Sequence, residues 1–375
     1  MNDPTKKKLL WITAIFALCG SLCFLYWVVW GRFSTSTDDA YVNGNMIMVT
    51  PQQSGIITGI WADNTQLVEE GQPLLELDKH DYQISLDHAK ANLADTLRTV
   101  AQIFLKVDEL KAKKDRVFAE FIKAQLDFEH RYALVADGGV AREDFEHSET
   151  ALAASAALVR EVEKELESQE AEVQGTTIAT HPKVERAKSE LRKAFLELHR
   201  CVVKAPAKGI ISNRKAQVGQ WVMKEDFLMA LIPLNEIWVD ANFREVNLKH
   251  LRIGQPVEVK ADMYGGDVKF HGKVQGLNGG TGSVFSILPP QNASGNWIKI
   301  VQRVPVKITL DPKELLVFPL ILGLSMNVDV NTHDRTGLRL PEASKERALY
   351  KTIIYNDELS EAEKLIEQIV AENIP

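Results

Sequence analysis

The sequence predicts an α+β, multidomain fold. Its parts are an N-terminal transmembrane helix, a β-sandwich divided into two halves, a long antiparallel coiled-coil hairpin of α-helices between the halves, and a membrane-proximal β-barrel. Three observations lead to this prediction: an apolar run lies near the N-terminus, two segments 154 residues apart resemble each other, and the hydrophobic period between them changes from two to seven. The chain of 375 residues is long enough for two or three domains, and its net charge of −7 gives no basic footprint for nucleic acid.

The apolar run, Leu9–Trp30, contains 22 uncharged residues, and a helix that crosses the hydrocarbon core needs about 20. Three lysines precede it within residues 1–8, whereas Arg32 is the one basic residue just after it. The positive-inside rule therefore predicts residues 1–8 in the cytoplasm, residues 9–30 as a single-pass anchor and the rest of the chain on the other side. A cleaved signal peptide is the alternative, but the run is longer than a signal core and no small-x-small cleavage site follows it.

Residues 46–78 and 202–234 are predicted to be the two halves of one small sandwich. Gly55–Leu77 aligns with Gly209–Leu231 without a gap, and eight of the 23 positions are identical. Both segments have the pattern of short strands separated by turn residues, and neither half could bury its own apolar face. A split sandwich of this kind resembles the lipoyl and biotinyl carrier domains.

Residues 81–200 are predicted to form a helical coiled-coil hairpin with its turn at 137–142. Apolar residues repeat every seven positions, with a second stripe four residues further on. The stripes are Leu86, Leu93, Val100, Val107, Phe121, Phe128 and Val135, and then Leu97, Phe104, Phe118 and Tyr132. Gly138 and Gly139 allow the backbone to turn, and the short connection favours an antiparallel pair. The first arm would be about 80–85 Å long, and residues 175–182 interrupt the second arm.

Residues 235–333 return to short β-runs punctuated by paired glycines, which predicts a small barrel or sandwich. The run Leu324–Val330 has two possible places: it closes this domain, or it pairs with Tyr41–Val49 next to the anchor. The tail, residues 334–375, is polar, and an amphipathic helix near Ser360–Ala371 is interpreted as a packing or partner element.

No catalytic or metal site is predicted. The nine histidines have no metal-ligand spacing, and no Ser, Cys or paired-carboxylate catalytic set is present. The glycine-rich loop 276–282 lacks the Gly-Lys-Ser/Thr ending of a phosphate-binding loop, so a barrel turn is the better interpretation. Lys224 is the nearest candidate for the modified lysine of a carrier domain, but its neighbours do not match the Met-Lys-Met or Asp-Lys-Ala context. We therefore expect no enzyme activity, no cofactor and no metal.

Six short segments, together with the order of the parts, carry a family resemblance. They are Thr37–Val42, Trp61–Asn64, Trp238–Phe243, Arg252–Val257, Gly280–Ser283 and Gln291–Lys299. The chain resembles the membrane fusion proteins, or periplasmic adaptors, of the HlyD superfamily, and it is most similar to the EmrA-type multidrug-export subunits. The resemblance covers about residues 5–335, and the last two segments are fairly specific to this subgroup.

The resemblance implies a non-enzymatic adaptor in the inner membrane of a Gram-negative bacterium, with the bulk of the chain in the periplasm. Its implied partners are an EmrB-like transporter of the major facilitator type, a TolC-like outer-membrane channel and further copies of itself. Related adaptors carry Arg, then Leu, then Ser at the hairpin tip, and the same spacing here gives Arg131, Val135 and Arg142, of which the third departs from the pattern. The expected channel-docking region is therefore Arg131–Arg142, including Gly138 and Gly139.

Two other functions are weighed against drug export. An adaptor of an ABC-type secretion or export system would use a similar scaffold, and a neighbouring gene with a Walker A motif would favour it. A biotinyl or lipoyl carrier subunit belongs to another class, and the anchor together with the unmatched lysine context argues against it.

Overall fold

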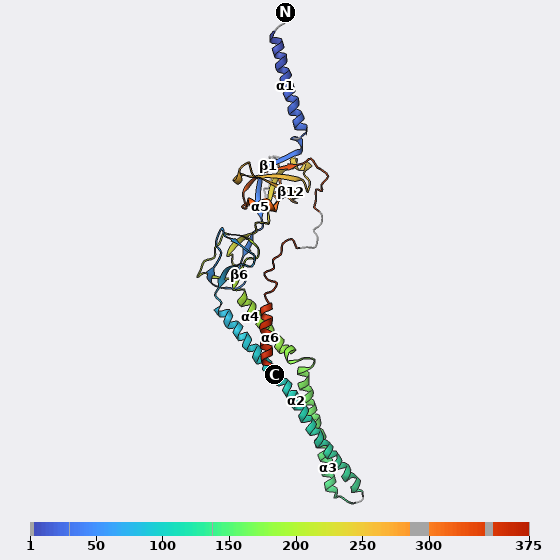
Figure 1. Ribbon diagram of the computed structural model, residues 1–375. Helices are drawn as coiled ribbons and strands as arrows, with labels where there is room; N and C mark the ends of the chain where they lie inside the picture. The colour runs from blue at the N-terminus through green and yellow to red at the C-terminus, as the bar shows by residue number, and fades with distance from the viewer. Residues whose placement is uncertain (1–3, 30, 137, 286–299, 342–347, 375) are drawn as a thin grey trace, which may run out of the picture.

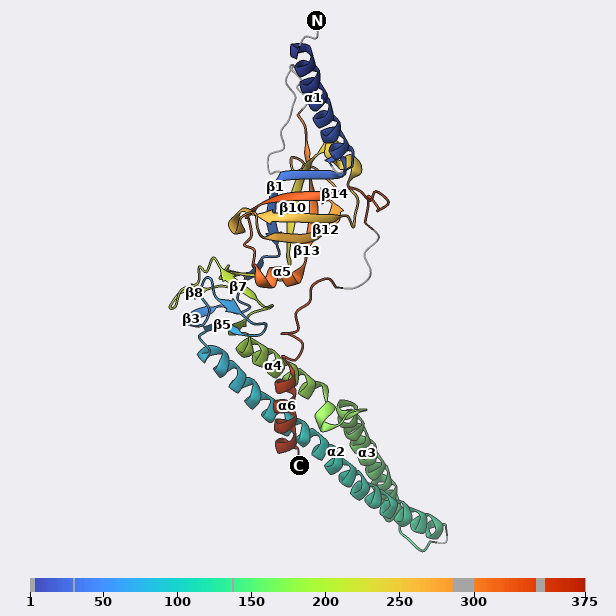
Figure 2. The same ribbon diagram turned by 45° about the horizontal axis from the view of Figure 1, so that its top comes forward.

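The computed structural model describes residues 4–29, 31–136, 138–285, 300–341 and 348–374. The molecule is elongated, and its parts follow one another from the N-terminal helix through the barrel and the sandwich to the hairpin (Figure 1). The tail then runs back from the barrel past the sandwich, and its helix lies beside the base of the hairpin (Figures 1 and 2). This arrangement confirms the predicted fold class.

Helix α1, Pro4–Val29, is followed by a single 3-10 turn, Gly31–Phe33. The span Trp11–Phe33 has a mean hydropathy of 2.2 and is 0% buried inside the protein, so it is long and apolar enough to cross a membrane. The last residue of the predicted span, Trp30, lies outside the described residues. A helix that the rest of the described fold leaves uncovered in this way is available to lipid.

Six strands close the barrel in the order β1-β10-β13-β12-β11-β14. Their bounds are β1 Ser34–Gly44, β10 Ile237–Arg244, β11 Pro256–Ala261, β12 Lys269–Leu277, β13 Arg303–Leu310 and β14 Ser325–Asn331. Alternate residues of β10 and β14 point inward, and Val239, Phe243 and Val328 are buried with Phe270. A short helix, α5 (Pro312–Val317), and the 3-10 turns Glu245–His250 and Asp262–Tyr264 complete the domain.

Strand β1 belongs to the barrel although it precedes the range 235–333 in which the barrel was expected. It pairs antiparallel with β10 and with β14. The two places considered for the Leu324–Val330 run are therefore not exclusive, because β14 pairs with β11 on one side and with β1 on the other. Strand β14 pairs with residues Ser34–Tyr41 of β1. The expected partner was Tyr41–Val49, which lies nearer the sandwich.

The sandwich consists of two four-stranded sheets, β2-β9-β7-β4 and β6-β5-β3-β8. The bounds are β2 Ile47–Val49, β3 Gly55–Ile60, β4 Leu67–Val68, β5 Pro73–Leu77, β6 Val202–Lys204, β7 Gly209–Ser212, β8 Trp221–Val222 and β9 Met229–Ile232. Each sheet takes strands from both halves of the repeat. The repeated pairs Ile57/Ile211 and Leu77/Leu231 are all fully buried in one core, so neither half is complete alone.

The hairpin has one continuous arm and one interrupted arm. Helix α2 spans His80–Val135, 56 residues or about 84 Å. The returning arm comprises α3 (Arg142–Val173), a 3-10 turn (Ile178–Thr180) and α4 (Pro182–His199). A lysine at a seam position is explained by the partner arm, since Lys114 Nζ lies 3.1 Å from Glu163 Oε1.

Two of the predicted seam residues, Phe118 and Tyr132, remain exposed, although the Tyr132 ring still lies beside Phe145 of α3. Their side chains are 49% and 64% exposed, and Val117 is buried beside α3 instead of Phe118. A straight helix drifts by about 20° for each heptad relative to a strict seven-residue repeat. Over the length of α2 this drift moves Phe118 and Tyr132 to the edge of the contact, whereas Phe121, Phe128 and Val135 of the other stripe stay partly buried up to the tip.

Candidate docking site at the hairpin tip

The turn at the tip ends α2 with a left-handed glycine. Gly138 has φ +71°, a conformation that residues with a Cβ rarely adopt. Its N–H donates to the Val135 carbonyl at 3.3 Å, and the N–H of Gly139 donates to the Leu134 carbonyl at 3.0 Å. These bonds satisfy carbonyls that the helix end leaves free, so the glycines are a helix stop as well as a turn. Asp137, the first residue of the predicted turn, lies outside the described residues.

An aromatic cluster closes the last turns of the hairpin. Phe128 of α2 faces Phe145 of α3 with ring centroids 5.4 Å apart, and Tyr132 lies about 6 Å from each, at 6.0 and 6.1 Å respectively. Such ring separations are favourable for aromatic pairs. Because Tyr132 remains largely exposed, the cluster both joins the two arms and presents an aromatic surface to its surroundings.

Arg131 connects the two arms. Its Nε lies 3.1 Å from Asp127 Oδ1 on α2, and its Nη1 donates to the Asp144 carbonyl of α3 at 3.0 Å. The guanidinium is therefore largely occupied within the hairpin. Arg142, by contrast, begins α3 with a side chain that is 90% exposed and forms an i,i+4 ion pair with Glu146 at 3.1 Å. Surface pairs of this kind contribute little, so Arg142 can be redirected toward a partner.

The five residues expected at the docking site thus lie at the tip but differ in their roles. Arg131 and the two glycines shape it, Val135 is half-buried, and Arg142 is presented outward. Leu134 lies inside the predicted region Arg131–Arg142 but was not singled out, and its side chain is 50% exposed next to the turn. The available signal was an apolar residue beside a glycine turn and outside the heptad stripes.

The groups that could carry chemistry have defined positions in the described residues. In the ranges that the structure covers, no group of three or more His, Cys, Asp or Glu side chains could hold a metal ion. Cys201 is buried, and that burial raises the pKa of its thiol to about 11, so the sulfur stays protonated and is a poor nucleophile. Lys224 lies exposed in the turn between β8 and β9, where its N–H donates to Ser54 Oγ.

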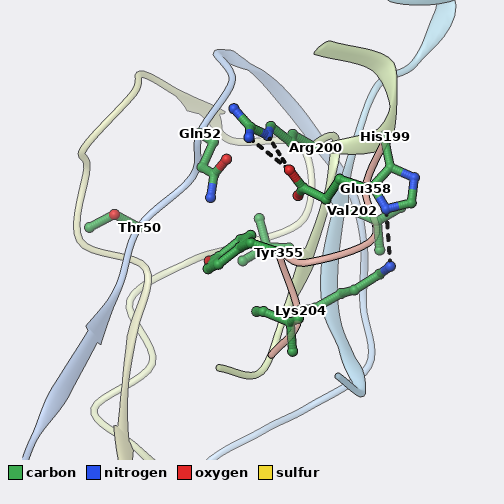
Figure 3. A pocket seen from close by; sticks show the side chains of 10 residues that line it. Thr50, Gln52, His199, Arg200, Val202, Lys204, Tyr355 and Glu358 are labelled. Atoms are coloured by element: carbon green, nitrogen blue, oxygen red, sulfur yellow. Dashed lines mark hydrogen bonds and ion pairs between the residues drawn. The ribbon is translucent and has the colours of Figure 1, made fainter. Parts of the chain in front are cut away.

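A small pocket lies where the sandwich, the end of α4 and the tail meet (Figure 3). Arg200 donates to Glu358 Oε2 from Nη2 at 2.7 Å and from Nε at 3.1 Å. His199 Nε2 lies 3.2 Å from Lys204 Nζ, and burial, followed by this nearby ammonium, lowers the pKa of the imidazole. Tyr355, from the tail, lies below the Arg200–Glu358 pair in the view (Figure 3). The pocket is thus a junction of three parts of the chain.

Comparison with known proteins identifies the hairpin and most of the rest of the chain. Residues 80–201 match the family model "EMRA, alpha-helical hairpin domain". The multidrug export protein EmrA of Escherichia coli K12 is 40% identical over 93% of this chain and 90% of its own length. The probable multidrug resistance protein EmrK of the same organism is 37% identical over 99% and 97%, and the fatty acid resistance protein FarA of Neisseria gonorrhoeae is 35% identical over 99% and 93%.

Among solved structures, the periplasmic adaptor protein EmrA is 19% identical, with a TM-score of 0.40, and the match covers 80% of this chain and 98% of that one. The assignment rests on the sequence relatives, which match nearly the whole length at well over 30% identity. The chain belongs to the EmrA-type family of membrane fusion proteins, which are adaptors and not enzymes.

Proposed function

We propose that the chain is the periplasmic adaptor of a tripartite efflux pump that exports drugs or other small toxic molecules. It would link an EmrB-like inner-membrane transporter of the major facilitator type to a TolC-like outer-membrane channel, as part of a homo-oligomer. The observation that carries this proposal is the arrangement of the two ends. The apolar helix α1 lies at one end of the molecule and the hairpin tip at the other, with the barrel and sandwich between them (Figure 1).

The proposed orientation places the N-terminus in the cytoplasm and everything after α1 in the periplasm of a Gram-negative cell. The three lysines before α1 support it through the positive-inside rule. A reporter that is active only in the periplasm, fused after residue 335, should be active. The same reporter fused before residue 5 should be inactive, and the reverse pattern would overturn the orientation.

The proposed contact with the channel is the tip, Arg131–Arg142. Tyr132, Leu134 and Arg142 are exposed there, and aromatic and arginine side chains are frequent energetic centres of protein interfaces. Arg131, Gly138 and Gly139 would act indirectly by holding the tip in shape, while Val135 supports the turn. In this proposal the departure of Arg142 from the family spacing changes the detail of the contact but not its location.

The names of the relatives support small-molecule export over polypeptide secretion. Deleting the gene in a strain with few other pumps should reduce the efflux of at least one compound, and the wild-type gene should restore it. If no compound in a broad panel is affected, drug export is wrong. Affinity purification from native membranes should recover a many-spanning transporter, and one with a nucleotide-binding domain would instead favour an ABC-type system.

A further inference from the structure

The C-terminal tail is attached to three parts of the molecule in succession. At the barrel, the N–H of Ile253 donates to the Leu338 carbonyl at 2.9 Å. At the sandwich, Glu70 Oε1 accepts from the backbone N–H of Ile353 and from Thr352 Oγ1, both at 3.1 Å. At the hairpin, the tail ends in helix α6, Ser360–Asn373, which packs on both α2 and α4 (Figure 2).

The docking of α6 is apolar on one face. Ala362, Ile366 and Ile369 are buried, and their spacing of four and three residues places them on one side of the helix. Ile366 and Ile369 belong to the same core as Leu93 of α2 and Leu191 of α4. The hairpin base is therefore a three-helix unit in which the third helix comes from the end of the chain.

Charged groups fix the position of α6 along this surface. Arg192 of α4 holds Glu363 through two bonds, from Nε at 2.6 Å and from Nη2 at 3.2 Å. Just before α6 in the tail, Glu358 accepts two hydrogen bonds from Arg200 at the pocket shown in Figure 3. Paired bonds from a planar guanidinium define direction as well as distance, so these two arginines set the register of the tail on α4.

The junction that the tail crosses has two covalent connections. The chain passes from β5 to α2 through Asp78 and Lys79, and from α4 to β6 through Arg200 and Cys201. Two short links side by side define an axis about which the hairpin could rotate relative to the sandwich. Because α2 is a lever of about 84 Å, a rotation of about 10° at the base would displace the tip by about 15 Å. A third attachment away from that axis would oppose the rotation.

We propose that the tail is a clasp that fixes the angle between the sandwich and the hairpin. Helix α6 is the part of the clasp that can detach from α2 and α4. The ion pairs Arg192–Glu363 and Arg200–Glu358 and the apolar face of α6 hold it closed. This role goes beyond the proposed function, since it concerns the chain by itself and requires neither a transporter nor a channel.

Pulsed electron paramagnetic resonance on the full-length chain in detergent tests the clasp. Spin labels are placed at Thr58 on the sandwich and Leu105 on α2, both exposed, after Cys19 and Cys23 are replaced by alanine; the buried Cys201 is left in place. Excess unlabelled chain suppresses distances between copies. The wild type should give one narrow distance distribution. Ile366→Asp should widen it at least twofold, because the carboxylate cannot stay in the apolar core.

A charge series supplies the controls. Glu363→Arg should widen the distribution of spin-label distances. Adding Arg192→Glu should narrow it again, because the two charges are exchanged and the ion pair between positions 192 and 363 is restored. Glu367→Arg makes the same charge change on the exposed face of α6 and should leave the distribution unchanged. Hydrogen exchange over residues 360–373 reports whether α6 has detached. If the distribution stays narrow in Ile366→Asp, the clasp is wrong, either because α6 detaches without effect or because its buried face does not hold it.

Discussion

The base and the tip of the hairpin are built from the same heptad pattern but reach opposite states. At the base, Leu93, Leu97 and Leu191 are completely buried. At the tip, Tyr132 and Leu134 remain 64% and 50% exposed. The base therefore uses its apolar residues for stability, whereas the tip leaves them available for a partner.

The difference follows from the number of helices at each end. Two paired helices cover a narrow seam, so any apolar residue outside the seam is exposed. Near the base, α6 covers the groove between α2 and α4 and buries a wider stripe. In the proposed function, the apolar residues left exposed at the tip, beyond the reach of α6, form the surface that meets the channel.

The largest expected effect comes from truncating matched leucines at the two ends. Leu93→Ala should lower the free energy of unfolding by about 3 kcal/mol, because it empties a fully buried site. Leu134→Ala should change it by less than about 0.5 kcal/mol, as is usual for surface positions. Thermal unfolding followed by helical circular dichroism measures both. Equal losses of unfolding free energy in the two variants would mean that the apolar residues of the tip also serve stability, which would contradict the difference between base and tip.

The next effect concerns the break between the two ends. His181 is 3% exposed, its Nδ1 accepts from the N–H of Lys183 at 3.2 Å, and its Nε2 lies 3.2 Å from the Glu172 carbonyl. The neutral ring with its proton on Nε2 satisfies both contacts, so it caps α4 and ties it to α3.

His181→Ala should cost about 1 kcal/mol, the usual value of an N-terminal cap. Hydrogen exchange should become faster in the first turn of α4, while the facing part of α2 stays protected. His181→Asn keeps an acceptor for the Lys183 N–H and should recover part of the loss. Unchanged exchange in the alanine variant would show that Pro182 and the arm contacts hold the break without the imidazole.

The smallest effect is a pH dependence at the base. The hydrogen bond from Arg192 lowers the pKa of Glu363 below its usual value of 4.5. The carboxylate therefore stabilises the folded chain above the usual pKa, and this contribution disappears as the pH falls through the lowered value. The side chain is 44% exposed, so screening by solvent limits the contribution to a fraction of 1 kcal/mol.

Comparing wild type with Glu363→Gln between pH 7 and pH 3 isolates this contribution. The difference in unfolding temperature between the two proteins should be largest at neutral pH and should shrink on acidification. A difference that grows toward acidic pH would have the wrong sign for a carboxylate stabilised by an arginine.

Local patterns predicted much of this fold, and contacts between distant segments limited the rest. The repeat placed Ile57 and Ile211 in one core because each half alone has an open face. Strand β1 was missed as a barrel strand because Ser34–Asp39 is polar and its partner on β10 lies about 200 residues away. The helix near Ser360 was expected, but its seat on α2 and α4 depends on a groove that no local pattern describes.

At the tip, the two glycines predicted the turn. Which side chains face outward could not be predicted in the same way, because it depends on how far α2 has rotated about its axis at that point. A strict seven-residue count placed Phe118 and Tyr132 in the seam, and the gradual drift of α2 moved them to its exposed edge. That the tip meets an outer-membrane channel stays a prediction.

Site-specific photocrosslinking in intact cells tests that prediction most directly. A photoreactive amino acid replaces Leu134 at the tip or, as the matched control, Leu105, which is 65% exposed on α2 nearer the base. We expect a crosslink to a TolC-like outer-membrane channel from position 134 and none from position 105. A channel crosslink from position 105 alone, or from neither position, would contradict docking at the tip.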